Sequence, residues 1–181
     1  MKIVSDTAPE FEVLLIGGRS GSGKTSVGYE VSDQLQAAGV SHCLIDGDNL
    51  SGAYPKAVDD PHGTRLTEAN LAALWRNYVA IGHRRLVYVN TVSVLEHEMI
   101  VRSMGGSARV TSVLLTASDD TVRERLTRRE IGGALQLHLE RSSAMATHLD
   151  SEVLVGVVRV ATDGRSVNEI AADVVEATNW T

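Results

Sequence analysis

The stretch GGRSGSGKTS occupies residues 17–26, directly after the apolar run EVLLIG at residues 12–17. Gly18 to Thr25 match the pattern G-x-x-x-x-G-K-T in the context that it requires, with a predicted strand before it and a helical repeat after it. Glycines let the backbone curl so that successive N–H groups point inward, and the positive end of a helix adds to their pull on anions. The stretch therefore predicts a phosphate cradle for a nucleoside triphosphate.

Two side chains of this stretch have distinct expected roles. Lys24 can reach the β- and γ-phosphates, and the Thr25 hydroxyl can ligate Mg²⁺. ATP and Mg²⁺ are thus the expected cofactors. The residues predicted to contact the nucleotide here are Gly18, Ser20, Gly21, Ser22, Gly23, Lys24, Thr25 and Ser26.

Size and composition indicate one domain over residues 1–181, since a chain of 181 residues that is 43% hydrophobic can bury one core. The net charge of −6 argues against binding to nucleic acid or to an anionic membrane. The single cysteine, Cys43, suits a reducing compartment. Neither a bilayer-spanning stretch nor a signal peptide is evident. We expect a cytoplasmic monomer or homodimer with a small-molecule partner.

Short Val/Leu/Ile runs alternate with helical patterns along the chain. The runs are apolar throughout, which is typical of strands buried on both faces. With helices between them, they predict an α/β fold with a parallel sheet and helices on both faces. Capping boxes are expected at Ser93 with Glu96 and at Ser166 with Glu169. The expected strands cover residues 12–17, 42–46, 85–90, 109–117 and 153–162.

The stretch LIDGDNL at residues 44–50 ends the second expected strand. Ligands of open parallel sheets bind outside the carboxyl ends of the strands, so Asp46 and Asp48 emerge beside the cradle. The two carboxylates are two residues apart in an extended segment and share a face. One can support Mg²⁺ through water, and the other can orient an acceptor hydroxyl or take its proton.

GGRSGSGKTS followed by IDGDNL resembles the small P-loop kinases of metabolites, such as gluconate, shikimate and adenylylsulfate kinases, in the nucleoside monophosphate kinase superfamily. The resemblance implies a P-loop NTPase three-layer fold, a five-stranded parallel sheet and a small helical lid. It places Asp46 near the metal and Asp48 on the acceptor hydroxyl. Related nucleoside monophosphate kinases often end the third strand with aspartate; here Asn90 stands there, which favours Asp46 as the metal carboxylate.

The expected lid covers about residues 123–150. The arginine-rich stretch DDTVRERLTRREIGG at residues 119–133 leads into it and supplies its arginines. Arginines can neutralise a transferring phosphoryl group, and lid closure excludes water. We expect Arg125 on the base or the phosphates and Arg128 or Arg129 on the transition state. The paired glycines at residues 132–133 are the expected hinge.

Near the last strand, VATDGRSV at residues 160–167 resembles the loop that brackets adenine in these kinases, with candidates Thr162, Asp163, Gly164 and Arg165. The acceptor is expected between the aspartate segment and the lid. Candidates for its contacts are Asn49, Tyr54, His62, Arg65, Arg76, His138 and Arg141.

These features favour an ATP-dependent kinase that moves the γ-phosphoryl group to a hydroxyl, or to a phosphate- or sulfate-type anion, of a small molecule. Two alternatives stay open. One is a nucleotide-binding ATPase or switch without an acceptor. The other is an antibiotic phosphotransferase, for which a large apolar pocket near Tyr54 and Trp75 would be expected.

Overall fold

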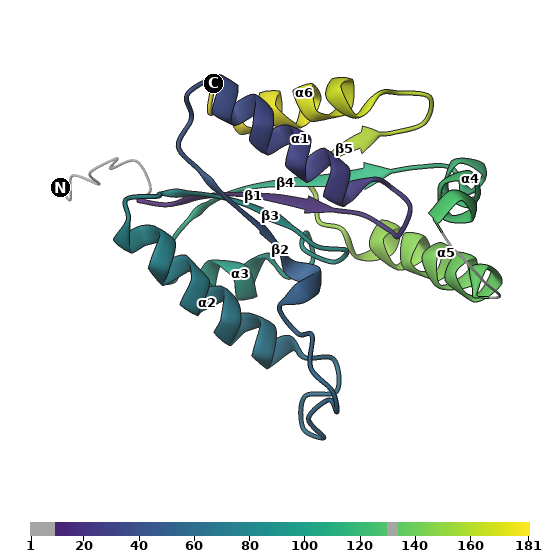
Figure 1. Ribbon diagram of the computed structural model, residues 1–181, viewed down its shortest axis with the longest axis horizontal. Helices are drawn as coiled ribbons and strands as arrows, with labels where there is room; N and C mark the ends of the chain where they lie inside the picture. Colours follow the sequence, from purple (N-terminus) through teal and green to yellow (C-terminus); the bar gives the residue numbers. More distant parts are fainter. Residues whose placement is uncertain (1–9, 130–133) are drawn as a thin grey trace.

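A five-stranded parallel sheet runs through the molecule in the order β2-β3-β1-β4-β5 (Figure 1). The computed structural model describes residues 10–129 and 134–181. The expected α/β architecture with a five-stranded parallel sheet is confirmed. The strands are β1 (Glu12–Gly17), β2 (Cys43–Asp46), β3 (Arg85–Val89), β4 (Arg109–Thr116) and β5 (Val158–Ala161).

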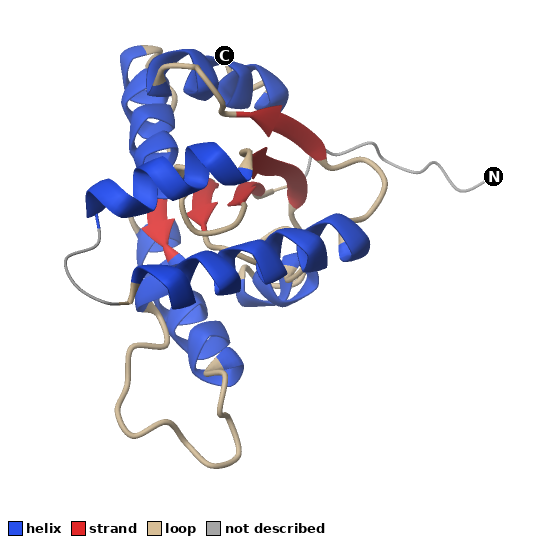
Figure 2. Ribbon diagram, turned by 90° about the vertical axis from the view of Figure 1, so that its right-hand side faces the viewer, coloured by secondary structure: helices blue, strands red, loops and turns tan. Residues whose placement is uncertain are grey.

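Helices cover both faces of this sheet. On one face lie α1 (Lys24–Ala37) and α6 (Val167–Thr178), and on the other lie α2 (Thr64–Ala80) and α3 (His97–Ser103) (Figure 1). Helices α4 (Asp119–Arg129) and α5 (Leu135–Glu152) follow β4 in the chain and lie at one end of the sheet. Figure 2 shows the molecule from that end. None of the helices in the described part of the chain has the length and apolar character needed to span a bilayer.

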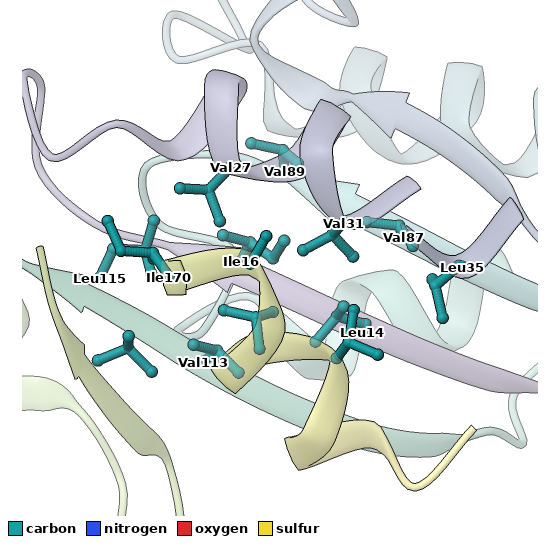
Figure 3. Packing of buried hydrophobic residues seen from close by; sticks show 14 of the residues in the cluster. Leu14, Ile16, Val27, Val31, Leu35, Val87, Val89, Val113, Leu115 and Ile170 are labelled. Atoms are coloured by element: carbon teal, nitrogen blue, oxygen red, sulfur yellow. The ribbon is translucent and has the colours of Figure 1, made fainter. Parts of the chain in front are cut away.

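The core between the sheet and α1 follows from the spacing of its apolar residues. Val27, Val31 and Leu35 are four apart, so they form one stripe along α1, and all three are buried. They pack on β1 residues Leu14 and Ile16 (Figure 3). This packing fixes the start of α1 against the end of β1, which is where the predicted cradle lies.

The opposite face of the sheet has its own buried cluster. Tyr88 of β3 packs there with Leu71 and Trp75 of α2 and Ile100 of α3. Trp75 is 3% exposed and meets Phe11 edge-on at 5.2 Å, so it is a core residue. The Tyr88 hydroxyl is buried and has no hydrogen-bond partner among the described residues.

Two local predictions were wrong. The last strand does not cover residues 153–162: β5 begins at Val158, because α5 runs on to Glu152 and a turn with Gly156 at φ 99° follows. The expected capping box at Ser93 does not form either. Glu96 is itself the N-cap of α3, and the Ser93 hydroxyl is buried without a partner in the described part of the chain. The capping box of Ser166 with Glu169 is confirmed.

The sheet register brings the ends of three strands to one edge. Val89 of β3 pairs with Ile16 of β1 and with Asp46 of β2. The segments that follow these residues, including Gly18 and Asn90, therefore leave the sheet side by side at its carboxyl edge. The expected glycine hinge at residues 132–133 lies outside the described residues.

Candidate active site

The loop between β1 and α1 is shaped by glycines with positive φ. Gly18, Gly21 and Gly23 have φ of 145°, 83° and 96°, which is a region open to glycine at little cost. A Cβ on Gly18 would lie 2.6 Å from the Leu115 carbonyl oxygen, so the loop also needs glycine for close packing. The sequence pattern thus folds into a tight turn at this position.

The N-terminus of α1 is open toward this loop. Gly23 is the N-cap, and no described side chain caps it or places an acidic group in the first turn. The first N–H groups of a helix have no acceptor within the helix itself, so the start of this 14-residue helix, with its positive dipole end, suits an anion. This is the environment that a terminal phosphate requires.

Lys24 lies inside the loop rather than in solvent. Its side chain is 7% exposed, and its ammonium group donates a hydrogen bond to the Arg19 carbonyl oxygen at 3.2 Å. The lysine thus spans the loop from the first residue of α1. A charged donor held at this position can shift to a phosphate oxygen without leaving the cradle.

Thr25 and Asp46 meet although 21 residues separate them in the chain. The Thr25 hydroxyl donates to a carboxylate oxygen of Asp46 at 3.4 Å. Mg²⁺ prefers oxygen ligands and keeps several waters, so it needs only one or two protein groups beside substrate phosphates. This pair of oxygens fits such a metal. No cluster of three or more His, Cys, Asp or Glu side chains with metal-binding geometry occurs within residues 10–129 and 134–181.

Asp48 lies beside this pair in the short 3₁₀ helix η1 (Gly47–Asn49). Its backbone N–H donates to Asp46 at 3.1 Å, and its carboxylate accepts from the Asn90 side-chain amide at 3.0 Å. The Asn90 oxygen accepts in turn from the Val92 N–H at 3.0 Å. Asn90 therefore orients Asp48.

A cavity of about 370 Å³ extends from the loop along α1. Residues 20–27 form its floor, and Asp48 and Arg125 contribute from two sides. Arg165, Val167 and Ile170 line it near the start of α6, so the expected adenine-side segment and the cradle share one space. The volume is in the range of pockets that bind small molecules.

Arg125 of α4 joins the loop to the end of β5. Its guanidinium donates to the Gly21 and Ser22 carbonyl oxygens at 3.2 and 3.3 Å, and to the Thr162 hydroxyl and carbonyl oxygens at 3.0 Å each. Thr162 is fully buried. Arg125 thus holds the backbone of the loop in place and also lines the cavity.

The remaining residues of the expected adenine loop make local contacts. Asp163 accepts hydrogen bonds from the Ser118 N–H and hydroxyl at 2.9 and 2.7 Å. Hydrogen bonding from Thr121 and Ser118 lowers the pKa of Asp163 to about 2. Gly164 has φ 65°, and Arg165 forms an ion pair with Asp173 at 2.8 Å. The segment is therefore a well-defined turn at the mouth of the cavity.

A second cavity, of about 360 Å³, lies on the α5 side of the loop. His138 and Arg141 of α5 both line it, as their spacing on one helical face suggested. Ser20 lines both this cavity and the cavity of about 370 Å³ described above, so the two cavities adjoin at the loop. Thr91, which follows β3, closes the far wall.

The other acceptor candidates lie elsewhere. Tyr54 is 99% exposed, and Arg65 is exposed and paired with Asp59 at 2.5 Å. Asn49, His62 and Arg76 are exposed as well. The segment that carries most of them projects from the body of the protein in Figure 1.

The arginines at the end of α4 differ in environment. Arg128 is exposed and pairs with Glu124, one helical turn earlier, at 2.5 Å. Arg129 ends α4, and its side chain lies outside what the structure describes. The expected role of either residue on the transition state stays a prediction.

Two residues at the site escaped the sequence reasoning. Arg19 is 5% exposed and turns away from the cradle, pairing with Asp119 at 2.5 Å and donating to the Ala117 carbonyl oxygen at 2.9 Å. Ser142 is 2% exposed, and its hydroxyl donates to the Ser20 carbonyl oxygen at 2.8 Å. No sequence spacing links α5 to the loop across 122 residues; the only signal was a serine on the apolar stripe of α5.

One family model matches part of the chain. Residues 10–80 match the adenylylsulphate kinase family model. No match was found among curated proteins.

Several solved structures share the fold over nearly the whole chain. A gluconokinase from Sinorhizobium meliloti 1021 has a TM-score of 0.58 at 21% identity, with 94% of this chain and 93% of that chain covered. The Mycobacterium tuberculosis APS kinase in complex with AMPPNP and APS has a TM-score of 0.54 at 24% identity, covering 94% and 98%. The Deinococcus radiodurans tunicamycin resistance protein has a TM-score of 0.62 at 16% identity, covering 94% and 97%. These likenesses confirm the expected fold, and with the family match they confirm the resemblance to small P-loop kinases.

Proposed function

We propose that this small P-loop kinase transfers the γ-phosphoryl group of Mg·ATP to a hydroxyl group of a small-molecule acceptor. The observation that carries the proposal is the arrangement around the N-terminus of α1. Lys24 lies within the loop, Thr25 contacts Asp46, and Asp48 lines the same cavity as the loop. A positive cradle, a metal-supporting pair and a carboxylate base are the parts that phosphoryl transfer needs.

Different groups of the protein bind the phosphates and accept the proton. The loop N–H groups and Lys24 hold the β- and γ-phosphates. Asp48, oriented by Asn90, accepts the proton of the acceptor hydroxyl as its oxygen forms a bond to the γ-phosphorus. The bond between that phosphorus and the β–γ bridging oxygen breaks, and ADP leaves with the bond's electron pair. Thr25 and Asp46 would hold Mg²⁺, which supplies neutralisation of the phosphate charge.

The α5-side cavity supports an acceptor that carries negative charge. It adjoins the loop at Ser20, and His138 and Arg141 supply hydrogen-bond donors and positive charge. An antibiotic acceptor of large apolar surface has less support here. Trp75 is buried in the core and Tyr54 is almost fully exposed, so these two side chains do not line a common apolar pocket of the kind that would favour an antibiotic.

The proposal also covers the domain organisation of the chain and its cellular location. We take the chain as one kinase domain over residues 1–181, with a lid at about 123–150 that includes most of α4 and α5. A cytoplasmic location is part of the proposal because ATP is available there. The buried Cys43, whose pKa burial raises to about 12, suits a reducing environment.

A screen of ATP consumption tests the proposal. Purified protein with Mg·ATP would be offered sugars, sugar acids, nucleosides, nucleotides, and aminoglycoside or phenicol antibiotics, each at one concentration. We expect strong stimulation by one class, with an anionic member preferred over its neutral analogue. Tight ATP binding with slow hydrolysis and no stimulation by any class would instead identify a nucleotide-binding switch.

A further inference from the structure

Four consecutive carbonyl groups of the phosphate loop are held by side chains. Three different side chains donate hydrogen bonds to these carbonyls. The donors are Lys24 for Arg19, Ser142 for Ser20, and Arg125 for Gly21 and Ser22, at 3.2, 2.8, 3.2 and 3.3 Å. Three of the four carbonyls are therefore held from outside the loop, by Ser142 and Arg125.

Holding a carbonyl also fixes the direction of an N–H group. In a trans peptide unit the C=O of one residue and the N–H of the next point in opposite directions. Ser142 donates to the Ser20 oxygen from the side of the α5-side cavity, so the Gly21 N–H points the other way. Gly21 itself lines the cavity of the phosphate loop, which Ser142 does not line. Gly21 has φ 83°, and glycine has the widest freedom to rotate at such a position.

The contact made by Ser142 is unusual for a serine within a helix. Such hydroxyls commonly bond to a carbonyl in their own helix, as the nearby Thr147 does to Ser143. Ser142 instead donates to Ser20, and it is 2% exposed. A buried hydroxyl directed out of its helix at a single loop carbonyl is specific to that carbonyl.

We propose that Ser142 is a positioning residue for the nucleotide: it acts through the Ser20 carbonyl to aim the Gly21 N–H at the terminal phosphates. The inference rests on the proposed kinase function, since it assumes that the loop binds Mg·ATP. Ser142 itself touches no phosphate. Its removal frees the Ser20–Gly21 peptide unit to rotate and leaves the Ser20 carbonyl without its donor.

Ser142→Ala, Ser142→Thr and Ser143→Ala form a matched set of variants. Alanine favours helix, so Ser142→Ala preserves α5. Threonine restores the hydroxyl, and its extra methyl group adjoins the α5-side cavity that Ser142 lines. Ser143 is the exposed neighbour and serves as the control. Calorimetric titration would measure the Kd of Mg·ATP and of AMP, which lacks the terminal phosphates.

For Ser142→Ala we expect the Kd of Mg·ATP to rise about tenfold, the effect of one hydrogen bond, while the Kd of AMP changes less than twofold. Ser142→Thr should restore most of the ATP affinity, and Ser143→Ala should match the wild type. Equal weakening of ATP and AMP, or unchanged ATP affinity in Ser142→Ala, would overturn the positioning role. A wild-type protein that does not bind Mg·ATP would overturn the kinase proposal, and the inference with it.

Discussion

The Thr25 hydroxyl and the Asp46 carboxylate lie 3.4 Å apart, joining the first turn of α1 to the end of β2. The contact places a neutral oxygen and an anionic oxygen at the mouth of the phosphate cradle. A metal bound there would be shared between the protein and the nucleotide. Asp46 is therefore the residue through which metal dependence can be tested.

Replacing Asp46 with Asn should raise the Mg²⁺ concentration for half-maximal activity by roughly 10–100-fold, the usual cost of losing a supporting group near a metal. The amide keeps the size of the side chain and removes its charge. A titration of activity with Mg²⁺ at saturating ATP measures the effect. Asp33→Asn, an exposed carboxylate of the same helix as Thr25, is the control and should leave the titration unchanged.

Lys24→Ala should lower kcat by about 10²–10³, because a buried charged donor to the terminal phosphates is lost. Steady-state kinetics with the acceptor identified by the screen measures this. The thermal unfolding midpoint without nucleotide would show that the variant is folded. Wild-type turnover in a folded variant would remove Lys24 from the mechanism.

Asp48→Asn should lower kcat by roughly 10²–10⁴, the range for loss of a general base, with little change in the Kd of Mg·ATP. Asn90→Ala should lower kcat by a smaller factor, since it removes only the 3.0 Å contact that orients Asp48. Comparing the two variants separates the loss of the proton acceptor, Asp48, from the loss of its orientation by Asn90. A fall in ATP affinity equal to the fall in kcat would assign Asp48 to nucleotide binding instead.

Gly47→Ala should destabilise the fold by about 1–3 kcal/mol, as overpacking of a core does. A Cβ at this position would lie 2.2 Å from the buried Tyr88 hydroxyl, so the segment that carries Asp46 and Asp48 must move. Gly52→Ala is the matched control, because its Cβ would lie 3.5 Å from the nearest atom, an ordinary contact. Urea unfolding of both variants, with their activities, tests the difference.

Asp163→Asn should cost stability at neutral pH but not in acid. The pKa of Asp163 is lowered to about 2 from a usual 3.8, so its charged form stabilises the fold fully above pH 4 and loses this effect as pH falls toward 2. The carboxylate is exposed, which limits the effect to below about 1 kcal/mol. Unfolding midpoints of wild type and variant should differ by a constant amount above pH 4 and converge as the pH falls from 4 to 2; a gap that stays constant down to pH 2 would contradict the assignment.

The sequence alone predicted the parts of the site that lie close together in the chain. The glycine pattern from Gly18 to Thr25 predicts the shape of the loop directly, because each glycine permits a backbone conformation that the loop requires at that position. The uniformly apolar runs predicted a parallel sheet, and the sheet's carboxyl edge then placed Asp46 and Asp48 beside the cradle.

Contacts between distant segments could not be read from the sequence. Ser142 and Arg125 reach the loop from helices more than 100 residues away, and their targets are backbone carbonyls that leave no residue signature. The capping box expected at Ser93 failed for a related reason. Burial of that hydroxyl against the sheet, a tertiary effect, overrode the local pattern.

Helix α5 carries Ser142, which holds the loop, and also His138 and Arg141, which face the second cavity. One helix thus adjoins both of the proposed substrate sites. If an acceptor draws α5 toward the loop, it tightens ATP binding, and ATP must then tighten acceptor binding by the same factor, because such thermodynamic coupling is reciprocal. Sequential titrations in either order should give equal coupling factors for the wild type and a smaller one for Ser142→Ala.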